Sequence, residues 1–386
     1  MTKRILQFGT SRFLQAHVDL FVHEARASGQ DIGPITVAKT TSGGSRAGRV
    51  ALIGRPEGFP VHIKGLKDGL AVDEIVTVRS VNRALTAERD WDELRRILVH
   101  ETDIIVSNVG DAGYEIHPGD HSRPAAAPPG FPAKLLSLLV ERFEAGGQPL
   151  VILPCELISN NGWVLRKLLN GLADDWLLSE AFKAWLARSV VICNTLVDRI
   201  VSEAIEPIGA VAEPYALWAI QREPGFEPPL EHPLVVITDD LEPYLRLKLH
   251  ILNLGHTYLA GIWHAEGRRS DETVRAILSD KAIRMRLLNL YTDEIVPGFA
   301  ARGMLDEAKR YVAATLERFD NPYINHRISD IFDNHAIKIE RRARDFITWV
   351  REKYPAIPFP QLEALVTQPV ARPAIEKIDA VFQEGE

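Results

Sequence analysis

A lysine, an asparagine and a histidine lie close together in residues 248–257, and together they suit proton transfer beside a carbonyl or hydroxyl group. The stretch has helical periodicity, with predicted buried positions at Leu245, Leu249, Leu252 and Leu259. Asn253 and His256 follow Lys248 by five and eight residues, which places them about 140° and about 80° away around an α-helix. We therefore expect convergence only at a helix end or break, with Gly255 as the weak point. The alternative is an amphipathic helix with solvated polar residues.

Composition narrows the class of protein. A chain of 386 residues with 25% charged and 46% hydrophobic residues is typical of a globular protein with two domains. The net charge of -7 argues against a general nucleic-acid binder. No apolar run reaches membrane-spanning length and the start predicts a strand instead of a signal peptide, so we expect a cytoplasmic enzyme with no nucleic-acid or membrane partner.

Metal and disulfide chemistry find little support in the sequence. Two cysteines, Cys155 and Cys193, make neither a disulfide framework nor a structural zinc site. His232, His250 and His264 are isolated along the chain, so no ligand cluster is predicted. We expect a metal-independent reaction.

A short apolar strand, a glycine turn and a helical pattern open the chain. The strand is predicted at Arg4–Phe8 and the helix from Phe13 to Ala25. Such a unit begins a dinucleotide-binding fold, in which amides at a helix N-terminus meet the pyrophosphate. The glycine pattern is partial, because Ser11 and Leu14 occupy its second and third glycine positions. A plain strand–helix connection is the alternative; the cofactor-binding candidates here are Phe8, Gly9, Thr10, Ser11 and Phe13.

The second predicted strand, Ile35–Ala38, leaves the choice of cofactor open. No acidic residue follows it to hold the ribose 2′-hydroxyl of NAD. Lys39 and Arg46 stand there instead and could meet a 2′-phosphate, or be surface charges. The prediction is NAD or NADP, with NAD favoured and Lys39 as a candidate contact.

Two further buried strands end in small polar residues. The strand predicted at Asp103–Gly110 contains Ser107 and Asn108 near its end, and we expect both on the nicotinamide side of a doubly wound sheet. The strand predicted at Pro149–Glu156 leads to an Asn-Gly turn, where the Asn161 carboxamide is expected to point into the cleft. Further strands are predicted at Val61–Ile63 and Glu74–Arg79, as an antiparallel extension of the sheet, and at Ser189–Asn194.

From Leu241 the pattern is almost wholly helical. The predicted fold class is α/β, with a Rossmann-like NAD(P)-binding domain at residues 1–236 and a mostly α-helical substrate and catalytic domain at residues 237–386. The predicted helices run from Pro243 to Trp263, Asp271 to Ser279, Ala282 to Tyr291, Leu305 to Phe319, Arg327 to Ile331, Lys338 to Lys353, Pro360 to Thr367 and Pro373 to Gln383.

Four ordered segments resemble the mannitol dehydrogenase family of polyol-specific long-chain dehydrogenases, which also contains fructuronate and tagaturonate reductases. LKLHILNLGHTYLA is similar to the family's lysine–asparagine–histidine signature, residues 8–17 to its glycine turn, and Leu196–Ile200 to its Val-Asp-Arg block. Residues 317–327 resemble the C-terminal block of the hexuronate reductases, and Val106–Asn108 and Leu153–Leu157 lean towards tagaturonate reductase. Two departures are Ser11 in place of a glycine and a chain shorter than typical hexuronate reductases.

The resemblance implies hydride transfer without a metal, in a cleft between the two domains. Lys248 is then the acid/base, Asn253 and Asn161 hydrogen-bond the reacting oxygen, and His256 orients the substrate. Burial beside a cofactor is expected to lower the pKa of the lysine towards neutral pH.

A sugar-acid substrate needs a cation for its carboxylate, and bidentate arginine fits best. Our candidates are Arg12 and Arg327, with Lys338 also available, although each is open to a surface or structural role. Asp198 matches a family aspartate near the substrate, or is a structural partner of Arg199. His326 and Asn325 are possible pocket residues, while residues 340–345 are expected to form a solvated helix face.

The predicted function is an NAD(P)-dependent oxidoreductase (EC 1.1.1) that interconverts a keto sugar acid and its aldonate, with tagaturonate–altronate in hexuronate metabolism as the best single choice. The alternatives are a mannitol-type polyol 2-dehydrogenase and a non-catalytic nucleotide-binding sensor. The expected partner is a small-molecule sugar acid or polyol, and the expected assembly is a monomer or small homo-oligomer.

Overall fold

The computed structural model describes residues 2–41, 47–124 and 126–367. The chain forms two compact units, Met1–Glu242 and Pro243–Glu386. The boundary predicted after Val236 falls inside a strand, β13 (Val235–Thr238). The helix predicted at Pro373–Gln383 and the side chain of Arg46 lie outside the described residues.

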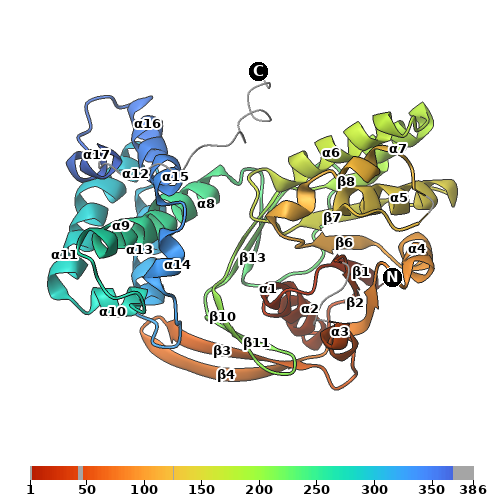
Figure 1. Cartoon of the computed structure of the whole chain (residues 1–386), viewed down its shortest axis with the longest axis horizontal. Coiled ribbons are helices and arrows are strands. Elements are labelled where there is room, and N and C mark those ends of the chain that lie inside the picture. The colour runs from red at the N-terminus through yellow and green to blue at the C-terminus, as the bar shows by residue number, and fades with distance from the viewer. Residues whose placement is uncertain (1, 42–46, 125, 368–386) are drawn as a thin grey trace. The chain divides into compact units, whose positions relative to one another are not determined.

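A six-stranded parallel sheet, in the order β5–β2–β1–β6–β7–β8, forms the centre of the first unit (Figure 1). The strand order reverses between β1 and β6, and ligands bind at the carboxyl ends of the strands at such a point. The Rossmann-like fold class is therefore confirmed, although the edge strand β5 was not predicted. The strands are β1 (Lys3–Phe8), β2 (Ile32–Lys39), β5 (Val81–Thr86), β6 (Ile104–Ser107), β7 (Leu150–Pro154) and β8 (Val190–Ile192).

Apolar side chains cover both faces of this sheet. Leu6 and Phe8 of β1 pack with α4, α5, α6 and α7, whereas Ile5 packs on the other face with α1 and α2. Such alternation is expected of a parallel strand buried on both sides. The helix predicted from Phe13 to Ala25 breaks at Ala16 and His17. The helices of this unit are α1 (Arg12–Gln15), α2 (Val18–Ala27), α3 (Ala47–Ile53), α4 (Trp91–His100), α5 (Phe131–Glu144), α6 (Asn161–Asp175) and α7 (Glu180–Ser189), with 3-10 turns η1 (Asp111–Tyr114) and η2 (Pro118–His121).

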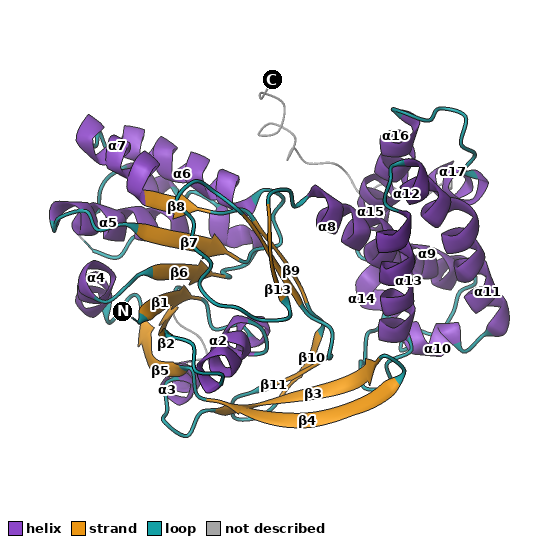
Figure 2. Ribbon diagram, turned by 180° about the vertical axis from the view of Figure 1, so that it is seen from behind, coloured by secondary structure: helices purple, strands orange, loops and turns teal. Residues whose placement is uncertain are grey.

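Two smaller sheets complete the first unit (Figure 2). The predicted antiparallel pair forms a hairpin closed by Asp68-Gly69, both with positive φ, as a two-residue hairpin turn requires. The hairpin belongs to a separate sheet, β10–β11–β3–β4, so the prediction that it extends the main sheet is wrong. The third sheet has the order β13–β12–β9. The remaining strands are β3 (Phe59–Lys67), β4 (Leu70–Val78), β9 (Thr195–Asp198), β10 (Val201–Ala204), β11 (Ala210–Ala212) and β12 (Leu217–Gln221).

The second unit is built from helices around one apolar core. The helices predicted at Leu305–Phe319 and Pro360–Thr367 have those bounds, and most others differ by a few residues, while α12 was not predicted. The segments are α8 (Glu242–Leu247), η3 (Lys248–Asn253), α9 (Leu254–Ala265), α10 (Val274–Leu278), α11 (Lys281–Leu290), η4 (Tyr291–Ile295), α12 (Val296–Ala301), α13 (Leu305–Phe319), α14 (Ile328–Phe332), α15 (His335–Ile339), η5 (Glu340–Arg344), α16 (Asp345–Arg351) and α17 (Pro360–Thr367).

The long helix predicted from Pro243 to Trp263 contains a π-turn. Helices α8 and α9 are joined without a break by η3, and the flanking Leu247 and Leu254 keep helical backbone angles. A π-turn bonds residue i to residue i+5 and is found mostly as a single turn inside an α-helix, frequently at functional sites. The departure from α-helical geometry therefore begins at Lys248, and Gly255 lies in the regular helix that follows.

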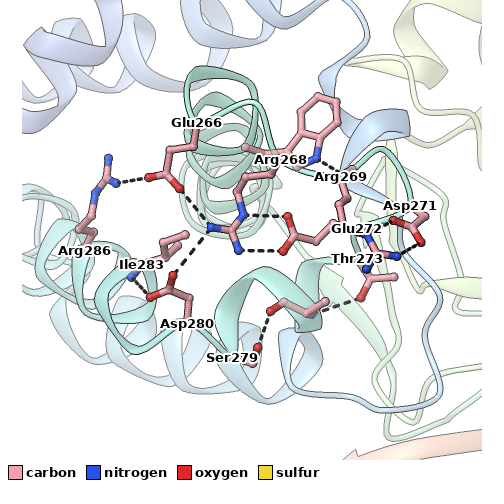
Figure 3. A network of polar contacts seen from close by, with 12 residues as sticks. Glu266, Arg268, Arg269, Asp271, Glu272, Thr273, Ser279, Asp280, Ile283 and Arg286 are labelled. Atoms are coloured by element: carbon pink, nitrogen blue, oxygen red, sulfur yellow. Dashed lines mark hydrogen bonds and ion pairs between the residues drawn. The ribbon is translucent and has the colours of Figure 1, made fainter.

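A network of ion pairs ties the start of the second unit together (Figure 3). Arg268 donates two hydrogen bonds to Glu272, at 2.8 and 2.9 Å, and also bonds Glu266 at 3.1 Å. Asp280 caps α11 by accepting from the main chain of Ala282 at 2.9 Å. The network links the end of α9 to α10 and α11, and so stiffens the end of the helix that carries η3.

Candidate functional site

The turn after β1 approaches the end of β6 too closely for any residue except glycine at position 9. Gly9 has a φ of +122°, and a Cβ there would lie 2.5 Å from the carbonyl oxygen of Asn108. The main-chain N–H of Asn108 donates to the carbonyl of Phe8 at 2.9 Å. The two strand ends on either side of the reversal in strand order are therefore in direct contact, which is the place for a dinucleotide.

Ser11, the residue that replaces a glycine of the usual pattern, connects this turn to β6. Its hydroxyl donates to Oδ1 of Asn108 at 2.9 Å and accepts from the N–H of Leu14 at 3.2 Å as the N-cap of α1. Nδ2 of Asn108 donates to the carbonyl of Cys155 at 2.7 Å, which joins β7 to the same arrangement. The serine therefore gives the turn a fixed side-chain contact that a glycine could not supply.

The other predicted cofactor residues differ in their exposure. The Phe8 side chain is buried against Phe131, with ring centroids 5.3 Å apart, which leaves only the main chain of Phe8 as a candidate cofactor contact. Thr10 and Phe13 are half-buried, and the Phe13 ring stacks on His17 at 4.7 Å. Lys39, at the end of β2, is only 5% exposed, which is not the surface position that contact with a 2′-phosphate calls for.

Ser107, a predicted cofactor contact at the end of β6, is buried with its hydroxyl turned into the protein. Its hydroxyl donates to Oε2 of Glu156 at 3.1 Å, and the Tyr114 hydroxyl donates to the same oxygen at 3.1 Å. Oε1 of Glu156 accepts the N–H of Val109 at 3.1 Å. Burial raises the pKa of the Glu156 carboxyl, and these hydrogen bonds counteract the shift. Serine, tyrosine and glutamate thus form a buried support beneath the ends of β6 and β7.

Asn161, predicted to turn its carboxamide into the cleft, has this side chain buried and bonded to main-chain groups of the first unit. The side chain is 0% exposed, and Nδ2 lies 3.1 Å from each of the carbonyl oxygens of Pro154, Glu156 and Thr195. Oδ1 accepts the main-chain N–H groups of Gly162 and Thr195, each at 2.9 Å. All hydrogen-bonding capacity of this amide serves to join β7, α6 and β9.

The Val-Asp-Arg block lies on β9 and just after it. Asp198 is buried at the end of the strand, and Arg199 donates to the carbonyls of Ala16 and Glu213 at 2.7 to 3.0 Å. Burial lowers the pKa of the Arg199 guanidinium to about 10, so it remains charged at neutral pH. Arg199 thereby anchors the chain between α1 and α2. Arg12, in contrast, is an exposed side chain in the first turn of α1.

In the second unit the π-turn changes how the catalytic candidates face one another. Lys248 and Asn253 are the first and last residues of η3, one π-turn apart, so a step of five residues brings them to the same side of the helix. His256 follows Asn253 by three residues in α9, where positions i and i+3 are surface neighbours. Lys248 and Asn253 are both half-buried. The π-turn thus brings Lys248 and Asn253 to one side of the helix, and Gly255 is not the break that the sequence predicts.

His256 is a buried histidine with positive neighbours. Its side chain is 6% exposed, and its Nε2 atom has no hydrogen-bond partner among residues 2–41, 47–124 and 126–367. Burial, followed by the charges of His326, Arg318, Arg342 and Lys338, lowers the pKa of this imidazole well below its usual value. The ring is therefore neutral at pH 7 and has a hydrogen-bonding atom available for a ligand, with positive charge beside it.

Of the cations predicted to bind a substrate carboxylate, Lys338 is among these neighbours and Arg327 is not. Arg327 is exposed at the N-terminus of α14, and its charge acts on Asp271. Lys338 is half-buried and donates to the carbonyl of Ile331 at 2.7 Å, and burial followed by the charge of Arg342 lowers its pKa. The positive charge near His256 therefore includes Lys338.

Two arginines near His256 were missed by sequence reasoning. The segment at residues 340–345 was expected to be solvated, but Arg342 is half-buried and donates to the carbonyl of Asn253 at 3.1 Å and to Oγ1 of Thr257 at 2.8 Å. Arg318 is 6% exposed at the end of α13. The available signal for Arg342 was its four-residue spacing from Lys338, which places both on one helix face. His326 is half-buried with its ring 4.7 Å from that of His256, and Asn325 is exposed.

Together, a doubly wound sheet with a glycine turn at its switch point and a helical unit with a lysine–asparagine–histidine turn define a nucleotide-dependent oxidoreductase. Comparison with known families agrees: residues 3–231 match the mannitol dehydrogenase Rossmann domain and residues 240–366 match the mannitol dehydrogenase C-terminal domain. The chain belongs to the mannitol dehydrogenase family, as its motifs predicted, and its cofactor is a nicotinamide dinucleotide.

Two similar curated proteins are both named altronate oxidoreductase. An altronate oxidoreductase of Escherichia coli O7:K1 is 34% identical over 371 residues, which cover 88% of this chain and 74% of the relative. An altronate oxidoreductase of Halalkalibacterium halodurans is 29% identical over 364 residues, covering 89% of this chain and 70% of the relative. The similarity therefore extends through both units.

Solved structures share the fold. A substrate-free D-sorbitol dehydrogenase superposes with a TM-score of 0.75 at 18% identity, covering 90% of this chain and 76% of the other. Mannitol 2-dehydrogenase of Pseudomonas fluorescens, in a ternary complex with NAD and D-mannitol, has a TM-score of 0.72 at 20% identity and covers 95% of this chain and 85% of the other. In the described part of this chain, no helix has both the length and the apolar character needed to cross a membrane.

Proposed function

We propose that this protein interconverts a keto sugar acid and its aldonate by NAD(P)-dependent hydride transfer, with tagaturonate and altronate as the substrate pair. The observation that carries the proposal is the positive surrounding of His256, which lies three residues after Asn253 and eight after Lys248. A polyol has no negative group for such a site, whereas a sugar acid has a carboxylate. The name altronate oxidoreductase, shared by the curated relatives, supports the same substrate class.

The cofactor fits the turn after β1. Gly9 and Ser11 bring the main chain next to the end of β6, and the first turn of α1 has N–H groups at Arg12 and Phe13 that no helical carbonyl can accept, as a pyrophosphate site requires. When bound, the nicotinamide supplies or accepts the hydride. We favour NAD over NADP because the Lys39 side chain is buried. Its ammonium is therefore not exposed at the surface, where it would have to meet a 2′-phosphate.

Lys248 and Asn253 of η3 then stabilise the charge on the reacting oxygen. Reduction of a ketone leaves negative charge on that oxygen, and the ammonium of Lys248 stabilises the charge and donates the proton; in the reverse direction the free amine accepts it. The Asn253 amide donates a second hydrogen bond, and loss of one such donor costs about 3 kcal/mol of transition-state stabilisation. His256, being neutral, orients a substrate hydroxyl through its Nε2 atom.

The substrate carboxylate is held by the positive side of this site. Lys338 and Arg342 lie four residues apart; burial and the charge of Arg342 lower the pKa of Lys338, and burial and the charge of Arg341 lower the pKa of Arg342 to about 10. A bound carboxylate relieves this repulsion, which makes its binding favourable. Keto acids are therefore expected to be turned over in preference to neutral ketoses.

The test compares NADH and NADPH oxidation with tagaturonate, fructuronate and fructose, in wild type and Lys248→Ala. We expect turnover of a keto acid and its loss, by at least a thousandfold, in the variant; Lys353→Ala, an exposed lysine on the same unit, serves as the control and retains activity. Turnover of fructose without turnover of the keto acids would reassign the protein as a polyol dehydrogenase. Equal activity of Lys248→Ala and wild type would refute the mechanism.

A further inference from the structure

Two main-chain carbonyls of the π-turn η3 accept hydrogen bonds from side chains of other helices. The carbonyl of Ile251 accepts the main-chain N–H of Leu254, three residues later, and the hydroxyl of Tyr291 also donates to it at 2.9 Å. Tyr291 is completely buried, and burial raises the pKa of its phenol, so the hydroxyl stays protonated and can donate. A side chain from a second helix thus adds a hydrogen bond to a main-chain group inside η3.

Gly255 makes room for this contact. A Cβ at position 255 would lie 2.0 Å from the Tyr291 hydroxyl oxygen and 3.2 Å from Cζ of the same ring. Any larger residue would push the hydroxyl away from the carbonyl of Ile251. Gly255 therefore allows the Tyr291 side chain to come close to the main chain, although its own backbone lies in regular α-helix.

A third helix supports the other end of the turn. Arg342 donates to the carbonyl of Asn253 at 3.1 Å and to Oγ1 of Thr257 at 2.8 Å, and this hydroxyl donates to the same carbonyl at 3.1 Å. The carbonyl of Arg342 in turn accepts from Nδ1 of His250 at 3.0 Å. Burial lowers the pKa of His250 to about 4, so it is a neutral, fixed donor at pH 7.

Both partners come from π-turns of their own. Tyr291 begins η4 and Arg342 lies in the middle of η5. Each of these turns lies within a longer helix whose flanking residues keep helical angles, as in η3. The bonds of Tyr291 and Arg342 show that η4 and η5 both reach η3.

We propose that Tyr291 and Arg342 are positioning residues that hold η3 in its π form, and that Gly255 allows them to do so. If η3 relaxed to an α-helix, the five-residue step from Lys248 to Asn253 would again turn them about 140° apart. The two groups that act on the reacting oxygen would then no longer face it together. This inference rests on the proposed function for its kinetic consequences and on the contacts above for its structural ones.

The first test is Tyr291→Phe, which removes only the hydroxyl. We expect kcat for the keto acid to fall at least tenfold while KM for NADH stays within twofold, because η3 lies outside the dinucleotide-binding unit. The deuterium isotope effect with labelled NADH should increase, since the chemical step becomes slower. Tyr258→Phe, a half-buried tyrosine of α9, is the matched control and should keep kcat within twofold. A kcat for Tyr291→Phe within twofold of wild type would overturn the proposal.

A double-mutant comparison tests the glycine. Gly255→Ala alone should reduce kcat at least tenfold, although alanine favours a helix. In the Tyr291→Phe background the closest contact is gone, so adding Gly255→Ala should reduce kcat by less than a further twofold. Losses that simply multiply would show that Gly255 and Tyr291 act independently, against the proposal.

Arg342→Lys keeps the positive charge but removes the forked contact with Asn253 and Thr257. We expect a fivefold or larger loss of kcat, whereas Arg341→Lys, at the exposed neighbouring position, should have no effect. This pair remains informative if Tyr291→Phe does not fold. Equal kcat values for the two arginine variants would count against the role of Arg342.

Hydrogen exchange separates this inference from the proposed reaction. Peptides that cover residues 248–257 should exchange at least tenfold faster in Tyr291→Phe than in Tyr258→Phe, whichever substrate the enzyme uses. Faster exchange without turnover of any keto acid would leave the support of η3 intact and refute only the substrate. Unchanged exchange in Tyr291→Phe would refute the support itself.

Discussion

Asp19 gives the protein a pH-dependent stability that one substitution should remove. It lies in the first turn of α2 with no exposed surface, and neither carboxylate oxygen has a well-formed hydrogen bond within the described residues. Burial raises its pKa to about 8, and the nearby Gln7 carboxamide lowers it only partly. The carboxyl is therefore protonated in the folded protein at neutral pH, whereas the unfolded chain has lost that proton.

The sign and size of the effect follow from this difference. Between a pKa of about 4 in the unfolded chain and about 8 in the folded protein, the folded state holds one more proton. The contribution of Asp19 is complete below the lower value and declines as pH rises through the upper one. The free energy of unfolding should fall by about 1.4 kcal/mol per pH unit from this group. Asp19→Asn has no proton to lose, so relative to wild type its stability should rise by about 2.7 kcal/mol from pH 5 to pH 7.

The assay is urea denaturation of wild type and Asp19→Asn at pH 5, 6 and 7, followed by circular dichroism and by tryptophan fluorescence. Asp306→Asn, an exposed position on α13, controls for the loss of a surface carboxylate and should differ from wild type by the same amount at each pH. A constant difference between Asp19→Asn and wild type over this range would mean that Asp19 is already ionised in the folded protein. That result would refute the argument from burial.

Two further substitutions test the cofactor turn and the ion-pair network. Gly9→Ala should weaken NADH binding at least tenfold in a fluorescence titration, because its Cβ would meet the Asn108 carbonyl; Gly29→Ala has a similarly positive φ with no atom within 4 Å, and should bind NADH normally. Glu272→Gln breaks a partly buried, doubly bonded pair, worth about 1 kcal/mol, and should lower Tm by about 3 °C, less so in high salt. Asp271→Asn, in an exposed pair, should leave Tm unchanged.

The dinucleotide-binding core could be predicted because its signals are local. A buried strand that ends in glycine, followed by a helix, already indicates the fold. The direction of individual polar side chains could not be predicted in the same way. Ser107 ends β6 and Asn161 follows β7, but both side chains bond inside the protein. The Ser107 hydroxyl donates to Glu156, and the Asn161 carboxamide donates to the main-chain carbonyls of Pro154 and Thr195. The position of a residue at a strand end does not tell in which direction its side chain points.

The partners of the predicted turn were hidden for another reason. Arg342 lies in a run of charged residues that has the composition of a solvated helix face, and only the packing of η5 against η3 buries it. Tyr291 likewise has no motif, since one tyrosine at the end of a predicted helix is an ordinary core residue. His250 and Arg342 are 92 residues apart, and Ile251 and Tyr291 are 40 apart. Contacts over such separations produce no periodic pattern in the sequence.

The π-turn η3 shows what the spacing of residues can and cannot predict. A spacing of five and three residues between Lys248, Asn253 and His256 is incompatible with convergence on a regular α-helix, so the sequence predicts an irregularity but not its kind. The sequence points to Gly255 as the position of the irregularity, because glycine weakens helices. In the structure Gly255 is helical, and the irregularity is a π-turn whose extra residue restores the alignment. Offsets that fit no regular helix are therefore evidence for a π-turn when both residues must act on one atom.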